Sequence, residues 1–508
     1  MGKRFLPTAE KFLSSYQALI VILSLTLLIR LPSLFEPLWV DDEAIYLTAG
    51  QKILRGGLMY VDIFDHKTLG IYYLAVATIK FFGASIWSWR FLLMIWVLAS
   101  LVAFYFLAKR LFNRRIAIWA VIFLALLTST PLIEGNVGNS EILMILPTIL
   151  GISVGLNKKF VLSGIFFSLA FLFKAPAILD FTAFFIFVAL TSGEVESIFK
   201  NLSRLAAGFF LPVLLTVGYF FAKGALGTYL YSTFWFNIGY VHYNNRFLIQ
   251  NGLLIIKALP LLFITAYLIA KAYRPLKSRR REAITPFEFL ILWLFFAFFG
   301  AVFAGRPYEH YLIQATPPFA LIAALVLFQK KFVRLGVSLL LAAVFLTFAL
   351  GFRPAIRLSY YPNFFRYVAG RITFDAYADS FKAGTSRNYA LASFLKGCKK
   401  FNTHNVCEEF RTNPGDKLYV FSDAPAIYFL SGLDPATRYI NFYHVVEDEA
   451  VKKAAAKEIV EAGPKYILVE ANQQGQFPAL ENILSSRYNL FAFYEDMAIY
   501  QIIPTAAQ

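Results

Sequence analysis

The sequence predicts a mainly α, polytopic membrane protein with about 11 transmembrane helices and a small C-terminal α/β domain outside the membrane. Of the 508 residues, 58% are hydrophobic and only 16% are charged, and the mean hydropathy is +0.60. These values lie outside the usual range of globular proteins. Apolar runs of roughly 17 to 25 residues, long enough to cross a hydrocarbon core as helices, recur from Tyr16 to Gly351.

Eleven apolar runs are the candidate transmembrane helices: 16–35, 88–108, 116–132, 140–156, 160–174, 177–191, 205–222, 252–271, 286–304, 310–329 and 333–351. Lysine and arginine gather in alternate connections, for example at 109–115 and 271–281. Cytoplasmic loops are expected to be basic, so this pattern places the N-terminus in the cytoplasm and the C-terminal tail outside. The predicted location is therefore the cell membrane, with the active site and the C-terminal domain extracytoplasmic.

The segment 36–87 is expected to be the first extracytoplasmic loop. Its helical pieces at 43–55 and 68–82 are predicted to lie along the interface, because the first carries charged residues and the second is short for a span. Moving the second piece into the membrane would invert every later loop and would place the basic clusters outside.

Two domains are predicted, a transmembrane domain at 1–352 and a soluble extracytoplasmic α/β domain at 353–508. In the second domain, the short apolar runs KLYVF at 417–421, KYILV at 465–469 and FAFYE at 491–495 alternate with helical segments such as 446–461. Such alternation is typical of a small α/β domain. Cys398 and Cys407 are the two cysteines, and an outer compartment permits a disulfide between them.

Most of the unusual polar residues fall in connections that this topology places outside. They are Asp41, Asp42, Glu43, Tyr46, Asp65 and Lys67 in the first outer loop, Glu141 in the second, and Lys174, Arg306 and His310 further along. Carboxylates beside a few cations suit a site in which Lys or Arg binds an anionic lipid headgroup and Asp or Glu removes a proton. Simpler interpretations stay open, because the three acids at 41–43 also suit the first turn of a helix and Lys174 also suits a lysine that extends towards water.

The sequence also bears on metal ions, nucleic acids and soluble donors as ligands. His66 and His310 are the candidates for a divalent metal such as Mg, Mn or Zn, although their spacing matches no compact metal motif and no cofactor is certain. The net charge of +17 is explained by basic loop ends, so no nucleic acid partner is expected. The sequence has no Walker loop and no G-x-G-x-x-G after a strand, so a donor group has to arrive through the membrane.

The first outer loop contains the motif D-E-x-x-Y as Asp42, Glu43 and Tyr46, and a second motif ends at Lys67 in the stretch 64–67. With these motifs, residues 1 to about 350 resemble the GT-C integral membrane glycosyltransferases, in particular the bacterial branch with the aminoarabinose transferase, lipopolysaccharide-core glycosyltransferases and protein O-mannosyltransferases. The resemblance implies a GT-C fold and the transfer of a sugar from a polyprenyl-phosphate carrier to an acceptor on the outer face.

The resemblance also implies roles for single residues. Asp42 matches the catalytic aspartate, the general base that deprotonates the acceptor hydroxyl, and Glu141 matches the acid of the second outer loop. Lys67 matches a lysine near the donor phosphate, where Lys174 or Arg306 could assist. The sequence departs from the family pattern beside this lysine, since Thr68 and Leu69 replace a proline and His66 replaces an acid. Asp65 could substitute for that acid, and Asp41 could share the role of base.

The predicted function is thus an inverting glycosyltransferase. Its expected partners are the polyprenyl-phosphate-sugar donor, a glycan, lipid or protein acceptor, and membrane lipids. Acceptor choice is expected to depend on the outer domain and the loop 223–251. Two alternatives from other classes are a polyprenyl-lipid or glycolipid transporter or flippase and a non-catalytic membrane scaffold.

Overall fold

The computed structural model describes residues 16–238, 253–273, 284–355, 357–397, 412–413, 415–446 and 448–503. The chain forms two compact units. We call Met1–Ser33, Lys67–Gly70 and Arg90–Arg357 the helical unit, and Leu34–His66, Ile71–Trp89 and Leu358–Gln508 the sheet unit. The segments 34–66 and 71–89 thus group with the C-terminal residues, while the predicted domains 1–352 and 353–508 stay a prediction. Both cysteines, Cys398 and Cys407, lie outside the described residues, so the disulfide between them stays an open question of the sequence.

The helical unit is built almost entirely from helices. Their bounds are α2 (Tyr16–Arg30), η1 (Leu31–Leu34), α5 (Ile86–Leu111), α6 (Arg114–Ser129), η2 (Pro131–Ile133), α7 (Ser140–Leu156), α8 (Phe160–Phe173), α9 (Ala177–Thr191), α10 (Val195–Ala222), α11 (Leu226–Leu230), the π-helix η3 (Tyr231–Trp235), α13 (Leu253–Tyr273), α14 (Pro286–Val302), η5 (Glu309–Ala315), α15 (Thr316–Phe328), η6 (Lys330–Phe332) and α16 (Val333–Ala349). A helix occurs at each of the eleven predicted apolar runs.

Several of these helices suit a bilayer. Among the described residues, five helical stretches are long and apolar enough to cross a membrane: Tyr16–Leu34, Ile86–Leu111, Val195–Ala222, Glu309–Phe328 and Lys330–Ala349. Five more apolar helices are shorter, at Gly70–Phe82, Ser140–Leu156, Phe160–Phe173, Ala177–Thr191 and Pro286–Val302. The chain is therefore an integral membrane protein of mainly helical fold, as predicted.

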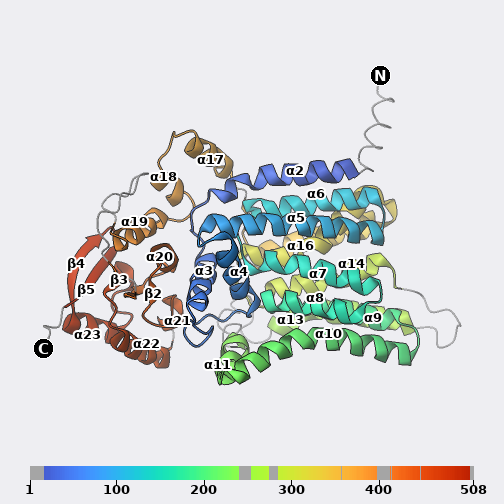
Figure 1. Ribbon diagram of the computed structural model, residues 1–508. Helices are drawn as coiled ribbons and strands as arrows, with labels where there is room; N and C mark the ends of the chain where they lie inside the picture. Colours follow the sequence, from blue (N-terminus) through green and yellow to red (C-terminus); the bar gives the residue numbers. More distant parts are fainter. Residues whose placement is uncertain are drawn as a thin grey trace. The chain divides into compact units, whose positions relative to one another are not determined.

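Close backbone contact joins α8 to α10, and Figure 1 shows α7, α8 and α10 side by side. Gly164 of α8 faces Gly208 of α10: a Cβ atom on Gly164 would lie 2.1 Å from the Leu205 carbonyl oxygen, and one on Gly208 would lie 2.0 Å from the Val161 carbonyl oxygen. Both distances are far below van der Waals contact. Small residues at these two positions therefore allow the helices to approach, as is common between membrane helices.

A buried arginine ties α2 to the last turn of α6 and to the loop before α7. Arg30, at the end of α2, has no exposed surface. Its guanidinium donates hydrogen bonds to the carbonyl oxygens of Thr128 at 2.7 Å, Gly135 at 2.8 Å and Asn136 at 3.3 Å. Because the planar group offers several donors in a fixed fork, one side chain satisfies three carbonyl groups that the adjoining irregular backbone leaves without helical partners.

The sheet unit combines a five-stranded mixed sheet with short helices. The strands β1 (Lys417–Phe421), β2 (Asp434–Pro435), β3 (Tyr466–Glu470), β4 (Tyr488–Tyr494) and β5 (Met497–Ile502) lie in the order β2-β1-β3-β5-β4. The helices are α3 (Asp41–Leu54), α4 (Gly70–Phe82), α17 (Tyr360–Val368), α18 (Phe374–Asp379), α19 (Thr385–Leu395), α20 (Ala426–Ser431), α21 (Tyr443–Val446), α22 (Glu449–Ala462), η7 (Ala471–Gln473) and α23 (Pro478–Arg487).

The central strands of the sheet are buried, and the edge strand β4 is exposed. β1 and β3 pair in parallel and are buried along almost their whole length, as expected for strands covered on both faces. β5 joins β3 and β4 in antiparallel fashion, and β4, at the edge in Figure 1, is largely exposed. The mainly α fold with a small C-terminal mixed sheet is therefore confirmed. The three predicted strands correspond to β1, β3 and β4, whereas β2 and β5 were missed.

Two helices of the sheet unit occur where the first outer loop was expected to hold helices. These are α3 and α4, against the predicted pieces 43–55 and 68–82. They approach closely, because a Cβ atom on Gly50 would lie 3.1 Å from the backbone of Ala75. Their location along the membrane interface stays a prediction.

Candidate functional site

The first turn of α3 carries the acidic motif. Val40 is the N-cap residue in extended conformation, and Asp41, Asp42 and Glu43 follow as the first turn. Carboxylates at this end complement the partial positive charge of the free backbone N–H groups. The three acids therefore do form the first turn of a helix, as the simpler interpretation of the sequence proposed. Their side chains also make the contacts described next.

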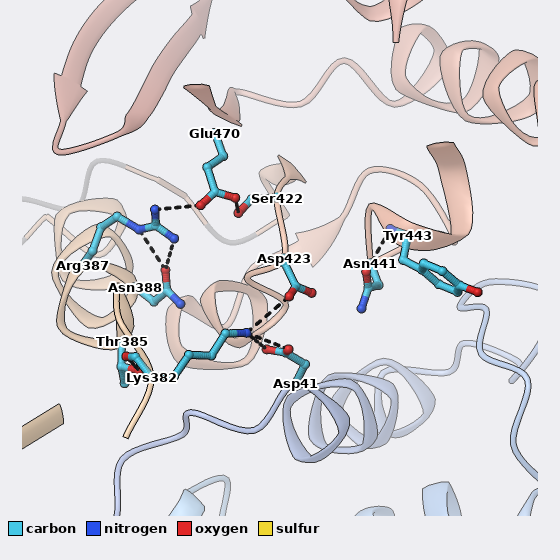
Figure 2. Close-up of polar contacts among 10 residues, drawn as sticks. All are labelled: Asp41, Lys382, Thr385, Arg387, Asn388, Ser422, Asp423, Asn441, Tyr443 and Glu470. Carbon is cyan, nitrogen blue, oxygen red and sulfur yellow. Dashed lines mark hydrogen bonds and ion pairs between the residues drawn. The ribbon is translucent and has the colours of Figure 1, made fainter. Parts of the chain in front are cut away.

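Asp41 is held by a lysine from the C-terminal part of the chain (Figure 2). The Lys382 ammonium nitrogen lies 2.9 and 2.7 Å from the two carboxylate oxygens of Asp41 and 3.3 Å from Asp423. Burial raises the pKa of Asp41 to about 7, although the Lys382 charge acts in the opposite direction. Burial alone would lower the pKa of Lys382, but the carboxylates of Asp41 and Asp423 raise it. The lysine therefore stays charged when Asp41 titrates.

Asp42 and Glu43 differ in their access to solvent. Asp42 is half-buried, and its Oδ2 accepts a hydrogen bond of 3.1 Å from the hydroxyl of Tyr46, one helical turn later. Glu43 has no exposed surface. In the D-E-x-x-Y motif, the Tyr46 hydroxyl thus sets the orientation of the Asp42 carboxylate, whereas the Glu43 carboxylate is buried.

A second polar cluster contains Asp65, His66 and His444. Asp65 is only 1% exposed; it accepts a 2.8 Å hydrogen bond from the hydroxyl of Tyr72, and its Oδ1 lies 3.1 Å from His66 Nδ1. Burial and the Asp65 carboxylate raise the pKa of Tyr72 well above its ordinary value. One ligand atom from each of the three residues lies within 4.8 Å of the others. Side chains of the kinds that bind metals therefore lie close together here. Of the two histidines in this cluster, the sequence pointed to His66 as a metal candidate but not to His444.

The helical unit contains a buried ion pair between two predicted site residues. Lys174, which follows the last residue of α8, places its ammonium nitrogen 2.9 Å from Oε1 of Glu141 in the first turn of α7. The other carboxylate oxygen accepts a 3.1 Å hydrogen bond from Ser140, and the ammonium also lies 4.8 Å from the ring centroid of Tyr311. The structure thus brings Glu141 and Lys174 together.

His310 forms an ion pair with Glu134, and its imidazole also interacts electrostatically with Glu141. Its Nδ1 lies 2.7 Å from Glu134, and its ring stacks on Tyr308 with centroids 5.7 Å apart. Among the described residues it is not part of the His/Asp group. Arg306 and Lys67 of the same unit are buried, at 7% and 9% exposure, which fits cations that are held in fixed positions.

Two acids that sequence reasoning did not single out are part of polar networks. Asp180 in α9 is buried and accepts hydrogen bonds of 2.6 Å from Trp293 and 2.7 Å from Gln314. An ionisable residue within the apolar run ILDFT was the signal that could have found it. Asp423, the second partner of Lys382, follows β1 and had no comparable local signal.

The sheet unit also has a cavity of about 360 Å³ beside β3 and α23. Its lining includes Phe421, Val469, Leu484 and Tyr500. None of the predicted site residues lines it, so this mainly apolar cavity is not the candidate active site.

The fold of the chain is similar to that of a protein whose structure has been solved with and without a bound lipid carrier. It is similar to ArnT from Cupriavidus metallidurans, in the apo state with a TM-score of 0.55 at 14% identity and bound to undecaprenyl phosphate with 0.56 at 13% identity, over 95% of this chain and 97% of that chain in both cases. The apo oligosaccharyltransferase of Archaeoglobus fulgidus aligns with a TM-score of 0.45 at 13% identity, over 96% of this chain and 74% of that chain. No curated protein matches by sequence.

Residues 66–220 match the family of dolichyl-phosphate-mannose-protein mannosyltransferases. Together with the ArnT fold, this match confirms the resemblance inferred from the sequence, which is to the GT-C membrane glycosyltransferases. It also confirms the predicted class of enzyme, a glycosyltransferase family that uses lipid-linked sugar donors.

Proposed function

We propose that the chain transfers a sugar from a polyprenyl-phosphate carrier to a hydroxyl group of a lipid, glycan or protein acceptor on the extracytoplasmic face. The observation that carries the proposal is the family match over 66–220, which includes Lys67, Glu141 and Lys174. The ArnT structure with undecaprenyl phosphate supports a polyprenyl phosphate as the carrier. The proposed topology has eleven spans with the N-terminus in the cytoplasm.

In the proposed reaction, the acceptor oxygen attacks the anomeric carbon while Asp42 takes its proton. The bond between that carbon and the phosphate oxygen breaks, and the polyprenyl phosphate leaves with the bonding electrons. A direct displacement of this kind inverts the anomeric configuration. Asp42 suits the role because its carboxylate is half-buried and is oriented by Tyr46, and a positioned base is what a weakly acidic sugar hydroxyl requires.

Asp41 is the alternative base. Its pKa of about 7 suits proton transfer at neutral pH, but both of its oxygens lie within hydrogen-bond distance of the Lys382 ammonium. That contact disfavours proton uptake, so we assign the base to Asp42 and a positioning role to Asp41. Full burial of Glu43 likewise fits a residue that positions α3 better than one that touches substrate.

The cations of the helical unit are assigned to the donor phosphate. Lys67 and Arg306 are buried, charged side chains, and such groups bind phosphate oxygens through charge-assisted hydrogen bonds and stabilise the leaving group as charge develops on it. Lys174 is already paired with Glu141, so in this proposal it orients Glu141 and contributes its charge to the phosphate only secondarily. His310 is a further substrate contact, and Asp65 is assigned to the metal site argued below. No step of this reaction is routed through a metal.

The test is a donor panel. Purified protein in lipid vesicles is incubated with polyprenyl-phosphate sugars and with glycan, lipid and peptide acceptors, and free polyprenyl phosphate and glycosylated product are measured by mass spectrometry. Stoichiometric release of carrier and formation of product support the transferase. Binding of a donor without its consumption, or movement of an intact donor across the vesicle membrane, would instead favour a transporter or flippase, and neither binding nor consumption would favour the scaffold.

A further inference from the structure

We propose that Asp65, His66 and His444 of the sheet unit bind one Zn²⁺ ion. This inference is independent of the transfer reaction, because it concerns a metal site and is tested by metal content. It replaces the earlier pair of candidates, His66 and His310, with a three-residue site in which His444 is new.

The three side chains offer the correct donor set. Two imidazoles and one carboxylate are ligands that Zn²⁺ accepts in proteins, and three protein ligands leave a coordination position for water or another ligand. Ligand atoms from the three residues lie within 4.8 Å of one another. In a tetrahedral site with bonds of about 2.0 Å, ligand atoms are about 3.3 Å apart, so small side-chain rotations are enough to close the site.

The backbone brings these residues together without help from an ion. The amide of Phe64 donates a 2.8 Å hydrogen bond to the Arg438 carbonyl, and Phe64 forms an isolated parallel bridge with Tyr439. The Phe64 ring then meets the His444 ring edge to face, with centroids 5.1 Å apart. The segment before Lys67 and the turn before α21 are therefore fixed to each other, which places His66 and His444 at a ring separation of 5.9 Å.

Burial and a supporting hydrogen bond favour an ion over a solvated cluster. Asp65 is 1% exposed, His444 is 6% exposed and the His66 side chain is 13% exposed. The Tyr72 hydroxyl, 2.8 Å from Asp65, fixes the orientation of the carboxylate in the way that outer-shell partners orient metal ligands. Removing such a partner typically weakens metal affinity by about 10- to 100-fold.

The experiment measures binding of Zn²⁺ and of Co²⁺ as a spectroscopic probe. The full chain is purified through a non-histidine tag in detergent, stripped with a chelator and titrated with each metal; metal content is measured by plasma mass spectrometry and Co²⁺ geometry by its visible absorption. We expect one equivalent of metal in the native chain. We expect the affinity to fall by at least about 100-fold after His444→Ala or Asp65→Asn, and by about 10-fold after Tyr72→Phe.

Matched histidine variants make the assignment falsifiable. His310→Ala removes a histidine that pairs with Glu134 in the helical unit, so it should leave metal affinity unchanged. Size-exclusion elution and the thermal midpoint of the stripped variants check that each is folded. The proposal is overturned if the native chain binds no metal, if His444→Ala binds as tightly as the native chain, or if His310→Ala abolishes metal binding. In that case, Asp65 and His66 would form an ion pair that needs no metal.

Discussion

The ammonium group of Lys174 lies 2.9 Å from the carboxylate of Glu141, and both side chains are largely buried, at 15% and 3% exposure. The sequence alone left Lys174 open between a lysine that extends towards water and a phosphate contact. The ion pair is a third arrangement, in which the charge of each residue compensates the other at the ends of α8 and α7. Removing either partner therefore leaves an uncompensated charge.

Lys174→Met should destabilise the protein by about 3–5 kcal/mol, because the buried Glu141 carboxylate then loses the ammonium group that lies 2.9 Å from it. The double variant Lys174→Met with Glu141→Gln should recover most of that loss, since both charges are removed together. Urea or thermal unfolding in detergent measures the difference. Equal stability of the single and double variants would show that the pair is not coupled.

Asp42→Asn should lower the turnover number of the proposed transfer by about 10²- to 10⁴-fold, the usual contribution of a general base, while donor binding persists. Tyr46→Phe removes the hydrogen bond that orients Asp42 and should give a smaller loss in turnover, with a shifted pH profile and an unchanged KM. Glu449→Gln on the first turn of α22 is the matched acid-to-amide control. If Asp41→Asn abolishes transfer and Asp42→Asn does not, the base has been assigned to the wrong residue.

The ion-pair cluster at Asp434 should make the sheet unit sensitive to acid. Burial raises the pKa of Asp434, but hydrogen bonds from Lys52 and Arg55 outweigh it and hold the pKa below its ordinary value of 3.8. A depressed folded-state pKa contributes stability that is present above 3.8 and is lost as the pH falls through the lower folded value.

Asp434→Asn should therefore lower stability at pH 6 by only about 0.5–1 kcal/mol, because the group is partly exposed and screened. The difference between the variant and the native chain should shrink as the pH is lowered below 3.8. Thermal midpoints over a pH series provide the measurement. A difference that grows at low pH would contradict the predicted sign.

Gly164→Ala should weaken the α8–α10 contact, because the added methyl group would lie 2.1 Å from a backbone carbonyl oxygen. Overpacking of this kind costs about 1–3 kcal/mol. Gly218→Ala in α10, where a Cβ atom meets nothing within 4 Å, is the matched control and should be neutral or slightly stabilising. Thermal unfolding of the two variants in the same detergent separates the packing effect from helix propensity.

The helices were predictable because each depends on a local pattern. The apolar run at 140–156, for example, corresponds residue for residue to α7, and KLYVF corresponds to β1. β5 was missed although its sequence, MAIYQI, is no shorter than the predicted strands, because a strand that gains stability by pairing with β3 and β4 carries little local signal.

Most of the polar contacts had no local signal either. Lys382 is separated from Asp41 by 341 residues, and His444 from His66 by an even longer stretch of chain, so only the tertiary fold brings them together. The contact between Asp42 and Tyr46 was predictable from the motif, because the two residues lie one helical turn apart. Whether the predicted site residues perform their assigned roles stays a prediction.

The bonds of Arg30 impose an order on biosynthesis. Its carbonyl partners lie 98 to 106 residues further along the chain, so they have not yet been made when α2 first reaches the membrane. At a rate of synthesis of about 5–20 residues per second, the carbonyl groups that accept these hydrogen bonds are made roughly 5 to 20 seconds after Arg30. During that interval water, lipid phosphates or the insertion machinery has to solvate the charge, and ribosome-stalled chains that end before Thr128 should be extracted from the membrane more readily than chains that extend well past Asn136.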